Sequence, residues 1–153
     1  MIRILIAFLT LVFLTTGCMT TLSNDEKAVQ CFASVKKIDD NLYKASCLIV
    51  ETDQSGKHEI IYSPKLVTKN DIPGKFEIIN DDRESVFALD IAIKEHRYAM
   101  THVGYLYKKR SNRLKYRGPV EFNKNVKIFE FVPIGMRKLI LKENDKFVTE
   151  NLK

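Results

Sequence analysis

The chain has 153 residues, with 25 basic and 19 acidic side chains and a net charge of +6 at pH 7. This length suits one domain with its own core, and a mild basic excess spread among many acids gives little support to a nucleic-acid-binding protein. The six glycines are scattered, no Gly-x-Ser-x-Gly sequence occurs and no catalytic cluster is visible, so we expect neither an enzyme nor a bound cofactor.

The first 17 residues have the pattern of a secretory signal peptide. Arg3 and the amino terminus supply positive charge, and residues 4–14 form an apolar run. As a helix this run would rise about 16 Å, which is too short to span a bilayer comfortably. The small residues 15–17 follow it. We therefore expect residues 1–17 to be removed on export, the alternative being an uncleaved membrane helix.

The segment from Leu14 to Cys18, Leu-Thr-Thr-Gly-Cys, resembles the lipobox of bacterial lipoproteins, which prefers Leu where this chain has Thr15. In that family the cysteine thiol receives a diacylglyceryl group, the signal peptide is cut before it, and the new amino terminus is acylated, for example with palmitate. The resemblance implies that Cys18 is lipidated and holds the protein at a membrane of the bacterial cell envelope. This anchoring is stable because two or more acyl chains hold a protein at a membrane, whereas one acyl chain does not.

The residue after the cysteine bears on which membrane holds the chain. Inner-membrane lipoproteins of many Gram-negative bacteria carry Asp there, whereas this chain has Met19, so the resemblance favours the outer membrane. Residues 18–26 are expected to form a short tether that keeps the domain near its membrane in the periplasm. Residues 27–153 are expected to form a single β domain.

Cys31 and Cys47 remain once Cys18 is acylated, and an even pair in an oxidising compartment favours a disulfide. If residues 28–36 and 42–51 form a hairpin around residues 37–41, Cys31 lies directly opposite Cys47. Closing this loop would stabilise the fold by about 3 kcal/mol in the chain-entropy model. Two alternatives to this cross-strand disulfide remain open: the two thiols are buried and free, or residues 24–37 form a short helix.

The pattern of the remaining residues predicts short strands separated by turns. Residues 84–95 are the clearest strand, because Phe87, Leu89, Ile91 and Ile93 alternate with Val86, Ala88, Asp90 and Ala92. Residues 98–109 and 114–122 are expected to pair around 110–113, and residues 125–132 and 136–143 around 133–135. Strands are also expected at 57–63, 64–68 and 75–79. This pattern indicates an all-β fold, a small antiparallel β-sandwich or barrel-like domain.

Residues 60–78 resemble a hairpin in the β-domain of secretins. Ser63-Pro64 leads one strand, and Pro73-Gly74 precedes a strand of alternating apolar residues. The resemblance covers about twenty residues and implies a related β topology, without the membrane-spanning hairpin or the multidomain length of a secretin.

Three histidines and one aspartate within a predicted strand are candidate site residues. His96 and His102 would share a strand face, but no Cys, Asp or Glu nearby completes a set with them or with His58, so we expect no metal site. Asp90 lies within an apolar strand on its small-residue face, and partial exposure to solvent accounts for it.

The one notable charge feature is a basic cluster between residues 108 and 117, interleaved with Tyr105, Tyr107 and Tyr116. Its cations are Lys108, Lys109, Arg110, Arg113, Lys115 and Arg117. At a hairpin tip they are either a solvated loop that prevents edge-strand aggregation or a contact for anionic lipid, lipopolysaccharide phosphates or an acidic partner protein. Nucleic acid has the right charge but the wrong compartment.

Two functions are compatible with these features. The first is a non-enzymatic binding or assembly accessory of a cell-envelope complex of the secretion, pilus or conjugation type. The second is a module that binds lipid, glycan or a host surface through the basic cluster.

Overall fold

The computed structural model describes residues 26–94, 98–107, 112–136 and 144–152. The signal segment and Cys18 lie outside the described residues. The elements in chain order are β1 (Ala28–Asp39), β2 (Leu42–Thr52), β3 (His58–Tyr62), β4 (Lys65–Lys69), β5 (Gly74–Ile79), β6 (Ser85–Lys94), β7 (Tyr98–Tyr107), β8 (Asn112–Glu121), β9 (Asn125–Phe131), η1 (Ile134–Met136) and α3 (Asn144–Asn151).

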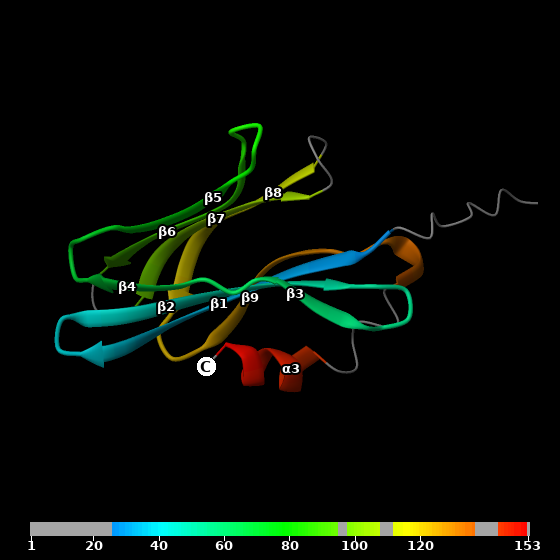
Figure 1. The fold of residues 1–153 in the computed structure, drawn as a ribbon. Coiled ribbons are helices and arrows are strands. Elements are labelled where there is room, and N and C mark those ends of the chain that lie inside the picture. Colours follow the sequence, from blue (N-terminus) through cyan, green and yellow to red (C-terminus); the bar gives the residue numbers. More distant parts are fainter. Residues whose placement is uncertain (1–25, 95–97, 108–111, 137–143, 153) are drawn as a thin grey trace, which may run out of the picture.

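These strands form two antiparallel sheets that pack face to face (Figure 1). Sheet A has the order β3-β2-β1-β9, with β4 also paired to β2, and sheet B has the order β5-β6-β7-β8. The β4–β5 and β8–β9 connections cross between the sheets, and a parallel bridge joins Val35 to Phe122 where β8 leaves sheet B. The all-β, sandwich-like fold expected from the sequence is confirmed.

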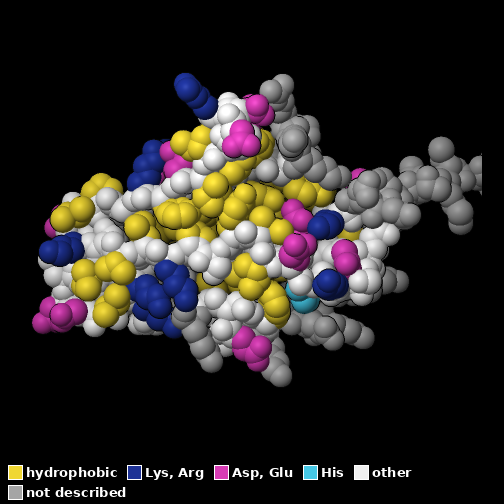
Figure 2. Space-filling view, in the orientation of Figure 1, with side chains coloured by type: hydrophobic (Ala, Val, Ile, Leu, Met, Phe, Trp, Pro, Cys, Tyr) yellow, Lys and Arg dark blue, Asp and Glu magenta, His cyan; other side chains and the backbone are white. Residues whose placement is uncertain are grey.

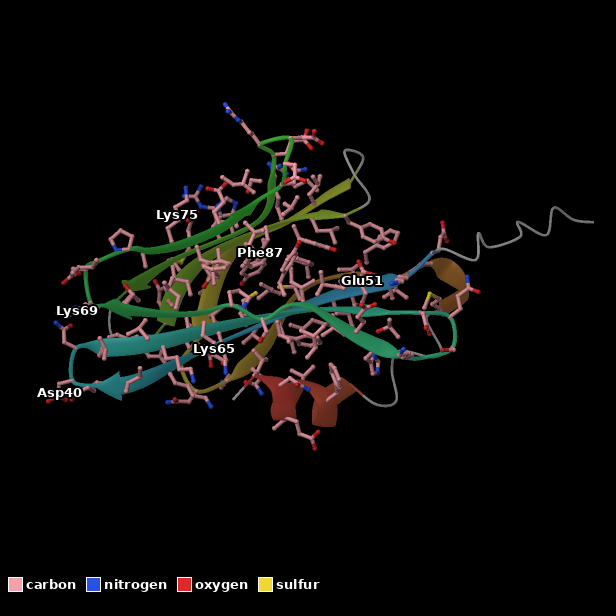
Figure 3. All side chains as sticks on the ribbon, viewed as in Figure 1. Asp40, Glu51, Lys65, Lys69, Lys75 and Phe87 are labelled. Atoms are coloured by element: carbon pink, nitrogen blue, oxygen red, sulfur yellow. The ribbon has the colours of Figure 1, made fainter. Side chains whose placement is uncertain are left out.

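The core lies between the two sheets because each strand turns its apolar alternate positions inward. In β6, Phe87, Leu89, Ile91 and Ile93 are all buried, as the alternation predicted. Phe87 sits between the sheets (Figure 3), with its ring centroid 5.5 Å from that of Tyr62 and 6.1 Å from that of Phe76. These rings join sheet A to sheet B, since Tyr62 belongs to β3.

Strands β1 and β2 are buried on both faces over much of their length, a feature that was not predicted from the sequence. Phe32, Leu48 and Val50 point away from the core between the sheets and pack against Val148 and Leu152 around α3. The helix thus covers part of the outer face of sheet A (Figure 1). No helix was predicted here, although Val148 and Leu152 have the four-residue spacing that places two side chains on one helix face.

The β1–β2 hairpin forms as predicted, but its register is shifted by two residues. β1 continues through Asp39, which pairs with Leu42, so the turn contains only Asp40 and Asn41. The predicted five-residue loop was wrong, because Asp and Asn suit a two-residue turn and an irregularity between Lys37 and Asp39 absorbs the extra residue. The alternative helix over residues 24–37 is also wrong, since β1 occupies most of that range.

The strand pairings after β2 agree only in part with those predicted from the sequence. β7 and β8 pair as a hairpin, as expected, but the predicted turn over residues 110–113 is wrong, because Asn112 and Arg113 belong to β8 and pair with Tyr107 and Leu106. β9 pairs with β1, and η1 occupies most of the predicted turn; residues 137–143, which were expected to pair with β9, lie outside the described part. β4 pairs with β2 and β5 pairs with β6, so the secretin-like hairpin over residues 60–78 is wrong.

Candidate functional site

The outer face of sheet B carries a row of polar and charged side chains that runs across four strands. Lys75 on β5 is opposite Asp90 on β6, Asp90 is opposite His102 on β7, and His102 is opposite Arg117 on β8. His102 Nδ1 lies 3.5 Å from Asp90 Oδ2, and both side chains are about half exposed. The partial exposure expected for Asp90 is confirmed, but the strand also gives it a histidine partner that the sequence did not indicate.

Small side chains next to this row leave a shallow depression in the sheet surface. The depression has a volume of about 370 Å³ and is lined by Pro73, Asp90, Ile91, Ala92, Met100, Thr101, His102 and Arg117. Nearby, a Cβ built on Gly104 would meet no atom within 4 Å, so the sheet surface is open there. No described element covers this face (Figure 1).

Strand β8 places Arg113, Lys115 and Arg117 on this same outer face, and these three residues are called the basic row below. Alternate positions of a strand share one face, and all three side chains are exposed. A guanidinium nitrogen of Arg113 donates a hydrogen bond of 3.0 Å to the carbonyl oxygen of Ser85, which holds that side chain across the sheet. Lys108, Lys109 and Arg110 of the predicted cluster lie outside the described residues.

The tyrosines of the predicted cluster do not belong to the basic row. Tyr105 and Tyr107 point into the core between the sheets, because they alternate with the outward positions of β7. Tyr116 is partly buried against the same core, and its hydroxyl donates to the carbonyl oxygen of Pro119. Gly118 makes room for this ring, since a Cβ there would lie 2.6 Å from the Tyr116 hydroxyl oxygen. The tyrosines that are interleaved with the cations in the sequence therefore do not share the outer face with Arg113, Lys115 and Arg117.

His58 and His102 lie on different sheets. His58 Nδ1 is 2.8 Å from Thr52 Oγ1, and its ring packs on Phe147 of α3 with centroids 5.1 Å apart. His96 lies outside the described residues. Within the described ranges, no three His, Cys, Asp or Glu side chains are placed to share a metal ion.

A polar cluster that the sequence did not reveal joins the two sheets near the start of β1. The Tyr105 hydroxyl donates a hydrogen bond of 3.1 Å to Glu51 Oε1, and Lys27 Nζ lies 3.2 Å from Glu51 Oε2. Burial, reinforced by the Glu51 charge, raises the pKa of Tyr105 far above its usual range, so the phenol remains a donor. The pKa of Lys27 is also raised, because the Lys27 ammonium has a hydrogen bond and a charge interaction with Glu51. These contacts connect β2 to β7 and serve the packing of the sheets.

Cys31 and Cys47 are buried free thiols in this structure, with their sulfur atoms 3.4 Å apart. The expected directly opposite arrangement is wrong: Cys31 is opposite Ile49, and Cys47 is opposite Ala33. A register shift of two residues keeps both side chains on the core face, so the cysteines become diagonal neighbours. The bridge itself stays a prediction.

We expect the redox state of this pair to be fixed as the chain folds. Burial raises the pKa of Cys31 well above its usual value, so little of the reactive thiolate forms in the folded protein. Protein isolated after export should carry the bridge, whereas protein folded with reduced thiols should keep both and resist alkylation until it is unfolded.

Alkylation of native and denatured samples, each with and without prior reduction, measures this directly. The Cys31→Ser variant is the control, because it leaves Cys47 free in both preparations. Exported wild-type protein whose two thiols alkylate on unfolding without reductant would contradict the predicted bridge.

Among the described residues, no helix combines the length and apolar character needed to cross a bilayer. No family model, curated protein or solved structure matches this chain.

Proposed function

We propose that this protein is a lipid-anchored, non-enzymatic accessory of a cell-envelope complex. The lipobox resemblance supplies the anchor at Cys18, and the folded β domain supplies the binding surface. The observation that carries the binding role is the basic row on the outer face of sheet B, which none of the described elements covers, beside the shallow depression. An acidic surface of an envelope protein partner fits this arrangement of charge.

The basic row has features that protein interfaces favour. Two of its three members are arginines, whose planar guanidinium groups pair with carboxylates through two parallel hydrogen bonds. Arg113 is already held by the Ser85 carbonyl oxygen, which reduces the entropy that it loses on binding. The small residues Ala88, Ala92 and Gly104 on the same sheet face allow close approach of a partner.

The test is recovery of a complex from gently solubilised membranes of the native host. The wild-type chain should co-purify with a discrete set of envelope proteins, and glutamate at all three positions of the basic row should abolish recovery of those same proteins. The matched control places glutamate at Lys37, Lys57 and Lys127, three exposed lysines in β1, the β2–β3 connection and β9, away from the outer face of sheet B, which changes the net charge equally. A wild-type chain that purifies without partners under all conditions, or equal loss in both variants, would count against the proposal.

A second candidate function is direct binding of the basic row to anionic lipid, lipopolysaccharide or glycan. Exposure of Arg113, Lys115 and Arg117 on one strand face favours it. Serine at these three positions should then weaken binding to lipopolysaccharide-containing vesicles, and added salt should weaken wild-type binding in the same way. If vesicle binding is unaffected by these substitutions, the row has no role at such a surface.

A further inference from the structure

Four lysines gather on the outer face of sheet A, close to the β1–β2 turn and beyond the area that α3 covers. Lys36 on β1 is directly opposite Lys44 on β2. Next in the sheet is β4, where Lys65 pairs with Ser46 and Lys69 with Leu42. The core-facing positions of β2 are the alternate ones, Tyr43, Ala45 and Cys47, so all four lysines share the outward face.

This arrangement has no internal compensation among the described residues. Like charges directly opposite one another on a sheet are destabilising, and Lys36 and Lys44 stand in that relation. In the described part of the chain, none of the four lysines has an ion pair, whereas neighbouring Lys37 and Lys127 pair with Asp40 and Glu130. Stability of the fold alone therefore gives no reason for these four charges to stand together.

Exposed aliphatic side chains accompany the lysines. Val67 is 54% exposed and lies on β4 between Lys65 and Lys69. Ile38, near the end of β1, and Ile72, in the β4–β5 connection, are 53% and 56% exposed. The turns beside them are joined by a hydrogen bond of 3.2 Å from the Asn70 backbone amide to Asn41 Oδ1. Figure 2 shows apolar and basic side chains side by side at this end of the molecule. This surface, called the lysine face, comprises Lys36, Lys44, Lys65, Lys69, Ile38, Val67 and Ile72.

Acidic groups are present but do not cancel the positive charge. Asp39, Asp40 and Asp71 lie at the two turns, and Asp40 is paired with Lys37. Asp71 accepts a hydrogen bond of 3.1 Å from the Asn70 side-chain amide. Figure 3 shows Asp40 at the extreme end of the hairpin, with Lys65 farther along the sheet. Positive charge thus dominates the sheet surface, and the acids mark its rim.

We propose that the lysine face rests on the anionic phospholipid headgroups of the membrane that holds the lipid anchor. The lysines contact phosphates, and Ile38, Val67 and Ile72 enter the boundary between headgroups and acyl chains. This inference rests on the proposed membrane location and names the surface that the domain presents to the bilayer.

The composition of the lysine face favours lipid over a protein partner. Cores of protein interfaces are enriched in arginine and aromatic residues and depleted in lysine. The lysine face has the opposite composition, with four lysines, three aliphatic residues and neither arginine nor aromatic side chains. A lysine ammonium is a compact charge on a flexible stem, which suits a fluid layer of phosphates without fixed partner geometry.

The covalent geometry of the tether allows this contact. Residues 18–26 can span about 30 Å when extended. β1 rises about 25 Å between Ala28 and Lys36, at about 3.3 Å per residue. A chain anchored at Cys18 can therefore bring the turn end of the sandwich down to the same bilayer.

The chain contains no tryptophan, so one introduced indole reports on a single place. The full lipidated chain carrying Val67→Trp is reconstituted into vesicles of phosphatidylcholine, with or without phosphatidylglycerol. With phosphatidylglycerol, its emission should shift to shorter wavelength and be quenched by brominated acyl chains. The matched control is Ile79→Trp, at a position 57% exposed on sheet B, whose emission should remain that of a solvated indole.

Serine at Lys36, Lys44 and Lys65 in the Val67→Trp chain should remove the shift, because each lysine near an anionic surface contributes about a fivefold factor in affinity. Solvent-like emission of Val67→Trp in both vesicle types, reproduced with Ile72→Trp, would overturn the proposal. A shift that appears only after envelope proteins are added would overturn it too, in favour of a protein partner.

Flotation with neutral vesicles separates this inference from the proposed anchor. Failure of the wild-type chain to float with phosphatidylcholine vesicles counts against the anchor alone. The tryptophan emission in phosphatidylglycerol vesicles still decides whether the lysine face contacts lipid.

Discussion

Replacing Cys18 with serine is expected to abolish incorporation of fatty acid into the chain and to leave residues 1–17 uncleaved. In the lipoprotein family that the first 18 residues resemble, acylation of the cysteine thiol precedes cleavage, and a serine hydroxyl does not replace that thiol. The expected loss of membrane-binding free energy is large, because each buried CH₂ of an acyl chain contributes about 0.8 kcal/mol and two or more acyl chains are lost together.

Metabolic labelling with an alkyne analogue of palmitate measures this effect, together with the mass of the amino-terminal peptide. Cys31→Ser and Cys47→Ser are matched controls that should keep full labelling, because both thiols are buried in the β domain. Fractionation alone does not suffice, since the uncleaved apolar segment can itself hold the variant at the membrane. A wild-type protein that begins with Met1 and carries no acyl group would eliminate the anchor and the membrane location proposed from it.

Replacing Phe87 with alanine is expected to lower the free energy of unfolding by about 3–5 kcal/mol. The Phe87 side chain is fully buried between the sheets, and its ring contacts those of Tyr62 and Phe76. Removing it opens a cavity where sheet A meets sheet B, and neighbouring side chains on two sheets relax only partly into that space. Such a loss is a large share of the stability of an ordinary domain.

Urea denaturation in one non-ionic detergent, followed by circular dichroism, measures the change. Phe87→Leu should restore much of the stability because it keeps most of the apolar volume, whereas Ile79→Ala, at an exposed position, should change the free energy by less than about 0.5 kcal/mol. If Phe87→Ala is no more destabilising than Ile79→Ala, the ring does not connect the two sheets.

The candidate site could be predicted only in part. Arg113, Lys115 and Arg117 were found from their density in the sequence, and their two-residue spacing explains why they share a face. The tyrosines beside them were misassigned because the neighbouring strand β7 turns Tyr105 and Tyr107 inward, toward sheet A. The lysine face was missed, since its four lysines come from three strands and no short stretch of sequence contains them together.

Local patterns determined which residues form strands and which side of a strand is buried. The alternation in β6 is one example, because a residue's side of a strand depends only on its position along that strand. The fold class follows from several such segments. Partner choice depends on contacts far apart in the chain: β9 joins β1 across about 100 residues, and α3 covers β1 and β2 from the other end. Only the tertiary structure decided these pairings, the diagonal placement of Cys31 and Cys47, and the gathering of lysines on sheet A. The reason is that they follow from packing among whole sheets, and local sequence does not encode that packing.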